Sequence, residues 1–387
     1  MYLVRTKRYI PALGALFAAA IAVRAVMTGS WTAACLAGGI ACLAWVATGR
    51  RGRVVAFNAG VLLILASVGL AYLEERAPER IQTFSDAPNV FILDPVLGHR
   101  PAANLHTRAT MHVGADLIYD VTYDTNEDAL RVGPPETGES PRDCVFFFGC
   151  SYTFGEGVEN DETLPYRVGV KAAGRYSARN FAYSGYGPHQ MLAAIESGLV
   201  DRAARCDPKV AIYQSHPHHV ARAAGKWWWD RHGPAYAIRE DGRVERVGSF
   251  ADRAAESTWS TELLRNSPMA QQLFDRSPVD IDDIRLFQGI VQRSRDLLAE
   301  RYPGIEFHIL HWDIEAPPVY RDGWTGDGIS IHLLSAVLPF DRSGWEHELL
   351  LPHDVHPTAR THALIADYVV ESVLHLDPAG SAATRAE

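Results

Sequence analysis

Three side chains in this sequence have the chemistry of a serine nucleophile with its base: Ser151, His356 and Asp354. A serine hydroxyl is a weak nucleophile and needs a base within hydrogen-bond reach. His356 stands in a loop before the last predicted helix, and Asp354 stands two residues earlier, where a carboxylate can orient the imidazole. We therefore predict Ser151 as nucleophile, His356 as base and Asp354 as the acid that orients the base.

The position of Ser151 is set by the strand that precedes it. Residues 145–148 are four bulky apolar residues, and Gly149 and Cys150 close the run. Such a run predicts a strand buried on both faces. A polar residue just past the carboxyl end of a buried strand lies where open α/β sheets bind ligands. Backbone N–H groups at Ser151 and in the glycine-rich turn at 180–187 can stabilise the oxyanion that acyl transfer requires.

The main part of the chain alternates between predicted strands and helices. The strands are expected at 144–149, 178–182, 210–214 and 305–311. The helices are expected at 162–173, 189–204, 280–301 and 357–374, with Pro357 in the first turn of the last helix. This alternation predicts an α/β fold with a doubly wound parallel sheet and helices on both faces.

Three short motifs resemble those of the SGNH (GDSL) hydrolase family. Residues 149–155, Gly-Cys-Ser-Tyr-Thr-Phe-Gly, are similar to its first block, which usually reads Gly-Asp-Ser. Residues 180–185 are similar to the second block, and Asp354-Val355-His356-Pro357 to the last. The blocks come in family order, and the resemblance spans about residues 90–376.

The resemblance implies a flavodoxin-like α/β/α sandwich and a carboxylic ester hydrolase without metal or organic cofactor. Members of the family are esterases, lipases, thioesterases and carbohydrate acetylesterases, with related O-acetyltransferases. Carried over by position, Ser151 is the nucleophile, His356 the base and Asp354 its partner, while the Gly185 N–H lines the oxyanion hole.

The sequence departs from the family pattern in three places. Cys150 replaces the usual Asp before the serine. Only one residue separates Asp354 from His356, and His353 stands at the usual Asp position, so either Asp354 reaches the imidazole from another angle or His356 works with Ser151 alone. The third block lacks its Asn, and the candidates for that oxyanion donor are Gln214, Ser215 and His216.

The first 75 residues predict a membrane anchor. Three apolar stretches, 9–27, 31–48 and 54–73, each have about the length of a transmembrane helix. Basic residues precede the first stretch and separate the second from the third, whereas the link at 28–30 is uncharged. By the positive-inside rule the N-terminus is cytoplasmic, and everything after the third stretch lies in the periplasm or outside the cell.

The whole chain divides into four parts by composition. We expect a transmembrane anchor at 1–75, a linker and small β-rich segment at 76–142, a hydrolase-like domain at 143–376 and a tail at 377–387. An insertion at about 217–278 breaks the strand–helix pattern and contains Trp227, Trp228 and Trp229. It is either a surface excursion that covers one end of the sheet or a lid with an aromatic wall.

Other chemistries are weaker matches to the sequence. The histidines at 216, 218, 219, 353 and 356 lack the spacing of helical zinc motifs. Cys150 is an alternative thiol nucleophile, but we expect its side chain to point into the sheet packing. Three cysteines, at 144, 150 and 206, follow the apolar region, and this odd number implies no complete disulfide framework. The net charge of −9, without a basic cluster after residue 75, argues against nucleic acid.

These observations together predict a membrane-anchored, extracytoplasmic serine esterase. It would hydrolyse acyl or acetyl esters through an acyl-serine intermediate, on an O-acetylated glycan or a lipid of the envelope. The alternatives are an O-acyltransferase of polysaccharide and a non-catalytic envelope binding protein on the same fold.

Overall fold

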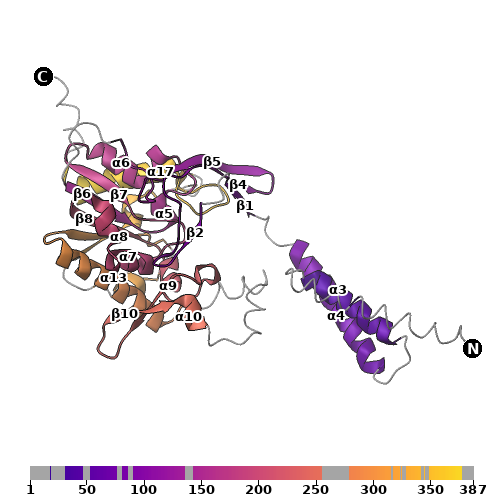
Figure 1. Cartoon of the computed structure of the whole chain (residues 1–387). Coiled ribbons are helices and arrows are strands. Elements are labelled where there is room, and N and C mark those ends of the chain that lie inside the picture. The colour runs from indigo at the N-terminus through magenta and orange to yellow at the C-terminus, as the bar shows by residue number, and fades with distance from the viewer. Residues whose placement is uncertain are drawn as a thin grey trace, which may run out of the picture. The chain divides into compact units, whose positions relative to one another are not determined.

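The structure, a computed structural model, describes the greater part of the chain after residue 80 and two helices before it (Figure 1). The described residues are 18, 31–46, 53–75, 81–85, 90–135, 143–254, 279–314, 317–322, 324, 328–340, 344 and 348–376. They form two compact units, one before Arg80 and one from Ile81 onward.

The first unit contains helices α3 (Trp31–Val46) and α4 (Arg53–Glu75), which pack closely where Gly39 meets Ile64. A side chain at Gly39 would place its Cβ 2.7 Å from the Ile64 side chain. Among the described residues, no helix is long and apolar enough to cross a membrane, so the predicted three-span anchor finds no support there. The first predicted span, at 9–27, lies outside the described residues except for Ala18. The membrane location stays a prediction.

The second unit is built on a parallel sheet of five strands in the order β12–β11–β8–β6–β7. The strands are β6 (Asp143–Phe148), β7 (Tyr176–Asn180), β8 (Asp207–Ser215), β11 (Glu306–His311) and β12 (Ile329–Leu333). Counted along the chain the order is 2-1-3-4-5, in which the direction of winding reverses between β6 and β8. The parallel α/β sheet is confirmed, and β12 is a fifth strand that the sequence pattern did not reveal.

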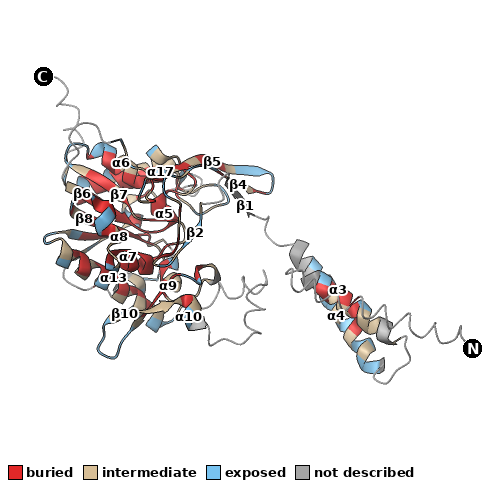
Figure 2. Cartoon of the chain, in the orientation of Figure 1, coloured by how far each residue is buried: buried red, intermediate tan, exposed pale blue. Residues whose placement is uncertain are grey.

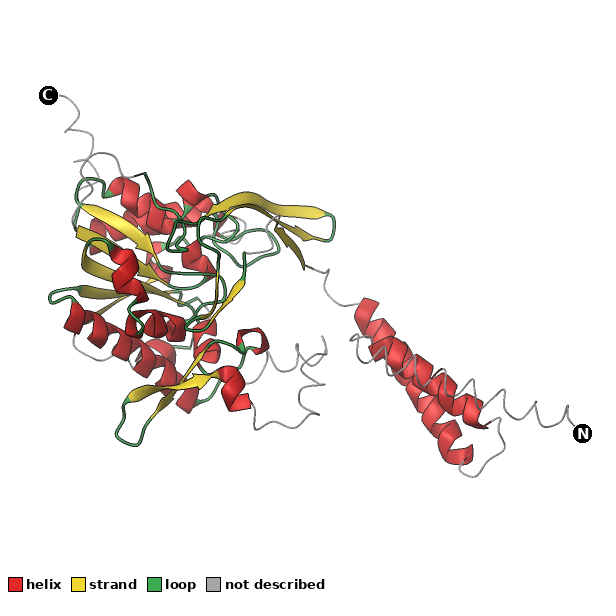
Figure 3. Ribbon diagram, in the orientation of Figure 1, coloured by secondary structure: helices red, strands yellow, loops and turns green. Residues whose placement is uncertain are grey.

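Helices cover both faces of this sheet (Figures 1 and 3). Val145 and Phe147 of β6 pack on the face covered by α6 (Leu164–Lys171) and α17 (Ala359–Tyr368). Phe146 and Phe148 pack on the opposite face, which is covered by α7 (Pro188–Glu196) and α13 (Ile281–Arg301). Successive side chains of a strand point to opposite faces, so one short apolar run supplies both cores. Figure 2 shows that burial is concentrated in the sheet and the inner faces of these helices.

Two predicted helices differ in detail from the observed ones. The helix expected at 189–204 is interrupted by Gly198, which has φ +70° and separates α7 from α8 (Leu199–Ala204). The helix expected from Pro357 begins at Ala359 after a Thr358 cap and continues as a π turn, Val369–Val373. Pro357 instead pairs with Leu350 ahead of the helix. The short helices α14 (Val319–Asp322) and α15 (Leu334–Val337) were not predicted.

The β-rich residues before β6 belong to the same compact unit as the sheet. They form an antiparallel sheet and a hairpin: β1 (Ile81–Ser85), β4 (His106–Val113) and β5 (Asp116–Asp124), then β2 (Ile92–Asp94) with β3 (Gly98–Arg100). After β5, the buried Arg131 donates to the backbone carbonyls of Phe154, Gly155 and Val158. This segment therefore holds the loop that follows Ser151.

The structure describes the insertion up to residue 254. It contains α9 (His218–Ala223), a 3₁₀ turn at Trp228–Asp230, the antiparallel pair β9 (Pro234–Ile238) and β10 (Val244–Ser249), and α10 (Phe250–Ala254). Residues 255–278 lie outside the described residues.

The cysteines after residue 75 form one disulfide and leave one free thiol, which agrees with the expectation of an incomplete disulfide framework. Cys144 and Cys206 form the disulfide, which joins the start of β6 to the residue before β8. The odd number of cysteines is explained by Cys150, which is buried and free.

Candidate active site

Ser151 lies at the sharp turn between β6 and the short helix α5 (Ser151–Phe154). The turn depends on Gly149, since a Cβ there would lie 2.1 Å from Thr153 Oγ1. Ser151 is 5% exposed and opens onto a pocket at the carboxyl end of the sheet, between β6 and β8. This is the winding reversal where α/β sheets bind ligands.

The structure brings the predicted Ser151, His356 and Asp354 into one chain of hydrogen bonds. The Ser151 Oγ lies 2.7 Å from His356 Nε2, and both Asp354 oxygens lie 2.9 Å from His356 Nδ1. An ionised carboxylate only accepts, so Nδ1 carries the proton and Nε2 accepts from the Ser151 hydroxyl. The short Asp354–His356 spacing therefore does not prevent the carboxylate from reaching the ring.

A compact loop makes this spacing possible. The Leu351 N–H donates to the His356 carbonyl at 2.9 Å, which folds residues 351–356 back on themselves. The Tyr152 hydroxyl donates to the Val355 carbonyl at 2.5 Å and ties the loop to α5. His353, which stands at the usual Asp position, has φ +55° and is exposed to solvent.

The electrostatics of the site favour a charged imidazole more than burial alone would allow. Burial by itself lowers the pKa of His356, but the nearby Glu156 carboxylate and the Asp354 hydrogen bond outweigh it, and the net pKa is raised above its usual value. Burial by itself raises the pKa of Asp354. The hydrogen bond that Asp354 accepts from His356 outweighs burial, so the net pKa of Asp354 is lowered. Both shifts stabilise the imidazolium–carboxylate pair that forms when His356 accepts a proton.

The Gly185 peptide is held from two directions. The His99 Nε2 lies 2.9 Å from the Ser184 carbonyl, and the Ser184 hydroxyl donates to Glu156 at 2.6 Å. Burial lowers the pKa of His99, so its ring is neutral and its Nε2–H is the donor. In a trans peptide the C=O and N–H point in opposite directions. An anchored Ser184 carbonyl therefore fixes the direction of the Gly185 N–H. Gly185 has φ +81°, and a Cβ there would lie 2.6 Å from Trp229.

Of the three candidates for the third oxyanion donor, only His216 lines the pocket. Gln214 is buried and accepts from the Thr153 hydroxyl at 2.7 Å, and Ser215 is fully buried beside His311. The His216 Nδ1 accepts from the His218 N–H at 3.2 Å, and burial lowers the pKa of His216 well below its usual value. The neutral His216 ring consequently carries its proton on Nε2.

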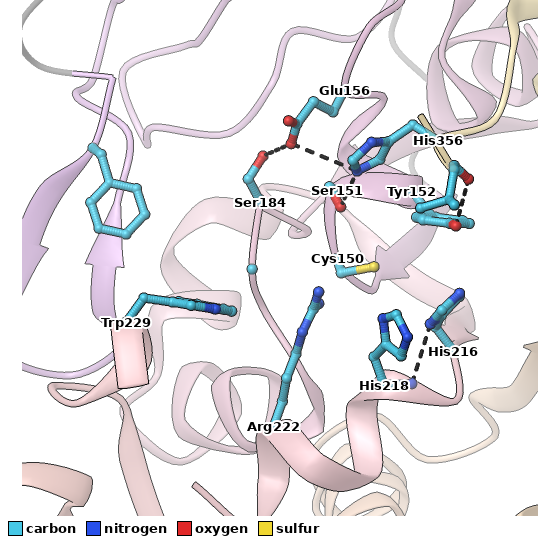
Figure 4. A pocket seen from close by; sticks show the side chains of 13 residues that line it. Cys150, Ser151, Tyr152, Glu156, Ser184, His216, His218, Arg222, Trp229 and His356 are labelled. Carbon is cyan, nitrogen blue, oxygen red and sulfur yellow. Dashed lines mark hydrogen bonds and ion pairs between the residues drawn. The ribbon is translucent and has the colours of Figure 1, made fainter. Parts of the chain in front are cut away.

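The pocket has a volume of about 290 Å³, and Figure 4 shows how its walls are composed. Ser151, Glu156, Ser184 and His356 lie on one side. His218, Arg222 and Trp229, which come from the insertion, lie on the other. The insertion thus contributes the aromatic ring of Trp229 to the pocket wall, and its role as a lid stays a prediction.

Glu156, Arg222 and His99 are pocket or supporting residues that the sequence reasoning missed. Glu156 had a local signal, because it stands between two glycines five residues after Ser151. Arg222 follows His218 by four residues, which places both on one face of α9. His99 had no sequence signal, since its role depends on a contact across 85 residues.

Within the described part of the chain, the arrangement of side chains does not support a metal site or a thiol nucleophile. No group of three His, Cys, Asp or Glu residues there is arranged to hold a metal ion. His219 is buried with its Nδ1 2.6 Å from the Tyr213 hydroxyl. Cys150 packs with Val145 and Phe147, as expected. It also lines the pocket, which the sequence did not lead us to expect. The hydrogen bond of the His356 Nε2 goes to Ser151.

Comparison with known proteins adds little to this picture. No family model and no curated protein matches the chain. A carbohydrate esterase family 2 enzyme with a carbohydrate-binding domain, from Corynascus thermopiles (Myceliophthora fergusii), is similar with a TM-score of 0.33 and 12% identity, over 68% of this chain and 73% of its own. An acetyl xylan esterase from the rumen bacterium Butyrivibrio proteoclasticus has a TM-score of 0.33 and 10% identity, over 63% and 67%. At these TM-scores neither likeness carries an argument about function, which rests on the site.

Proposed function

We propose that this protein is a serine ester hydrolase that works through an acyl-serine intermediate. The observation that carries the proposal is the hydrogen-bond chain from Asp354 through His356 to Ser151, at 2.9 and 2.7 Å. The resemblance of the three sequence blocks to SGNH hydrolases supports the same assignment. Catalytic roles for Ser151, His356, Asp354 and Gly185 are part of the proposal.

In the first half of the reaction, the Ser151 Oγ attacks the ester carbonyl while His356 Nε2 takes its proton. The Ser151 N–H at the start of α5, where helix N–H groups lack an intrahelical acceptor, and the Gly185 N–H stabilise the oxyanion. His356 then gives the proton to the leaving alcohol. In the second half, water attacks the acyl-serine, His356 takes a proton from it, and the acid is released as Ser151 regains its hydrogen.

The decisive test is covalent labelling with a fluorophosphonate together with hydrolysis of p-nitrophenyl acetate. The wild-type protein should be labelled at Ser151 and cleave the ester, and Ser151→Ala should lose both, with kcat falling by about 10⁴-fold or more. Cys150→Ala is the matched control and should keep both. Label retained in Ser151→Ala but lost in Cys150→Ala would assign the nucleophile to the thiol. A wild-type protein that takes no label and cleaves no ester would favour a binding protein.

We propose water as the acyl acceptor and an acylated glycan or lipid of the envelope as the substrate. The pocket around Ser151 is small, which suits an acetyl or short acyl group. Acetyl transfer to a sugar acceptor that outpaces hydrolysis would instead make the protein an O-acyltransferase. Measuring released acetate with and without the sugar separates the two outcomes.

We also propose that the unit from Ile81 onward lies outside the cytoplasm, anchored by the apolar stretches. Support comes from those stretches, from the basic residues that flank them and from the Cys144–Cys206 disulfide, since disulfides persist mainly in oxidising compartments. Alkaline phosphatase fused after residue 376 should be active in the bacterial host, whereas an inactive fusion would place this unit in the cytoplasm.

A further inference from the structure

Arg222 is a cation in the pocket wall opposite the Ser151 hydrogen-bond chain (Figure 4). It belongs to α9, and its guanidinium is held in place by neutral groups. Its Nη1 donates to the Tyr186 carbonyl at 2.8 Å, and its Cζ lies 5.7 Å from the centre of the Trp229 ring and 6.0 Å from that of Trp227. These contacts position the guanidinium, and none of them is with a charged group.

No carboxylate lies within 4 Å of the Arg222 guanidinium among the residues that the structure describes. The acid among the described lining residues is Glu156, which already accepts from the Ser184 hydroxyl at 2.6 Å and lies 3.9 Å from His356 Nε2. The Arg222 Nε is buried and has no hydrogen-bond acceptor. Within the described part of the chain, the pocket therefore holds a positive charge without an ion-pair partner.

The neighbouring histidines do not share this charge. Burial lowers the pKa of His218, and burial followed by the neighbouring His218 lowers the pKa of His216, with Arg222 contributing to both shifts. Both rings are consequently neutral near neutral pH, and Arg222 is the permanent cation of the lining residues. A partly desolvated cation without a counter-charge is costly, and an anion that enters the pocket removes that cost.

We propose that Arg222 binds an anionic group of the substrate, so that the site selects esters that carry a carboxylate close to the ester bond. This inference rests on the proposed ester hydrolysis. A guanidinium presents a planar pair of N–H donors that matches a carboxylate, and hydrogen bonds between charged groups are about twice as strong as neutral ones. In a pocket of about 290 Å³ the carboxylate and the ester lie within one small molecule or one sugar residue.

The test compares esters that differ only in charge. To place the carboxylate on the alcohol part of the ester, 3- and 4-acetoxybenzoate are compared with their methyl esters. To place it on the acyl part, 4-nitrophenyl hydrogen adipate is compared with its methyl ester. Arg222→Gln should lower kcat/KM for at least one charged ester by about 10- to 100-fold and change that of its neutral counterpart by less than about threefold. Arg222→Lys keeps the charge without the planar pair of donors and should retain part of the preference.

The matched control is Arg243→Gln, which removes an exposed arginine that is paired with Asp241 on the β9–β10 turn. It should leave the charge preference unchanged. Equal losses for charged and neutral esters in Arg222→Gln, with folding verified by circular dichroism, would overturn the inference.

The two proposals can fail separately. If Ser151 is labelled and p-nitrophenyl acetate is cleaved but no charged ester is preferred, the ester hydrolase stands and the role of Arg222 is rejected. If no ester is cleaved, binding of 4-acetoxybenzoate and its methyl ester to the Ser151→Ala protein is measured by the fluorescence of the pocket tryptophan. Tighter binding of the anion, lost in the double variant with Arg222→Gln, supports the anion site without the hydrolase, and equal binding rejects it.

Discussion

The two walls of the pocket differ in how their polar groups are satisfied. On the Ser151 wall, the hydroxyl, imidazole and carboxylates are bonded to one another or to Ser184, and the loops that carry them are fixed by Tyr152. On the Arg222 wall, a guanidinium faces the pocket with a carbonyl and two indole rings as its neighbours. The polar groups of the first wall are already bonded to one another, whereas the guanidinium of the second wall has no carboxylate partner among the described residues.

The same contrast separates two arginines. Arg131 is buried, and it donates to Asn160 and to backbone carbonyls on both sides of Glu156. Burial lowers its pKa to about 10, which still leaves it protonated at neutral pH. Arg222 makes one hydrogen bond with the described residues. One arginine therefore serves the fold, and we propose that the other serves the ligand.

Breaking the hydrogen-bond chain of the Ser151 wall should lower the activity most. Asp354→Asn keeps the size of the side chain but no longer forces the proton of His356 onto Nδ1, so kcat for p-nitrophenyl acetate should fall by about 10³- to 10⁴-fold. The activity of Asp313→Asn should be unchanged, because this half-buried acid lies outside the pocket lining and accepts from Ser335 at the start of α15. A loss of less than about tenfold in Asp354→Asn would mean that His356 and Ser151 act as a dyad.

The two arginines should also differ in their effect on stability. Arg131→Met leaves several buried carbonyls without donors and should lower the free energy of unfolding by about 3 kcal/mol or more. Arg222→Met removes one hydrogen bond together with an unpaired charge and should change it by about 1 kcal/mol or less. Urea unfolding of both variants measures the difference, and equal losses would contradict the division of roles.

A smaller effect is expected where His99 orients the Gly185 peptide. His99→Phe keeps the ring that stacks on Phe91 at 4.1 Å but removes the donor to the Ser184 carbonyl. We expect kcat to fall by about tenfold with KM unchanged, because loss of a whole oxyanion donor costs about 10²- to 10³-fold and here the donor is only misaligned. His106→Phe, at an exposed histidine that is bonded to Asp124, is the matched control, with kcat unchanged. A parallel rise in KM would indicate a role in binding.

The smallest effect is a shift in pH dependence. His356 must be neutral to accept a proton, so activity is lost as the pH falls through its pKa, which the Glu156 carboxylate raises. Glu156→Gln keeps an acceptor for the Ser184 hydroxyl and removes the charge, so the acid limb of kcat/KM should move to lower pH. Profiles between about pH 5 and pH 8 measure it. An unmoved limb would assign the raised pKa to Asp354 alone.

Much of the fold could be predicted from the sequence because its signals are local. The apolar run before Ser151 and the alternation of strands with helices indicate a parallel sheet, and four of its five strands were placed within a few residues. The strand at Ile329–Leu333 was missed because it is short and mostly half-buried, which gives no clear apolar run. Gly198 divides a predicted helix because its backbone has a positive φ, and the spacing of apolar residues does not indicate such a conformation.

For the site, the amino-acid sequence alone indicates the groups that can do acyl-transfer chemistry: a serine after a buried strand, an Asp-x-His loop before the last helix and a glycine turn between them. Whether Asp354 reaches His356 despite the short spacing could be seen only in the folded chain, because that depends on how the loop at 351–356 folds back. The same holds for the pairing of Cys144 with Cys206 and for the positions of His99, Glu156 and Arg222 around the pocket. The strands and turns are encoded by neighbours along the chain, whereas partners and charges around a pocket depend on contacts between residues far apart in sequence.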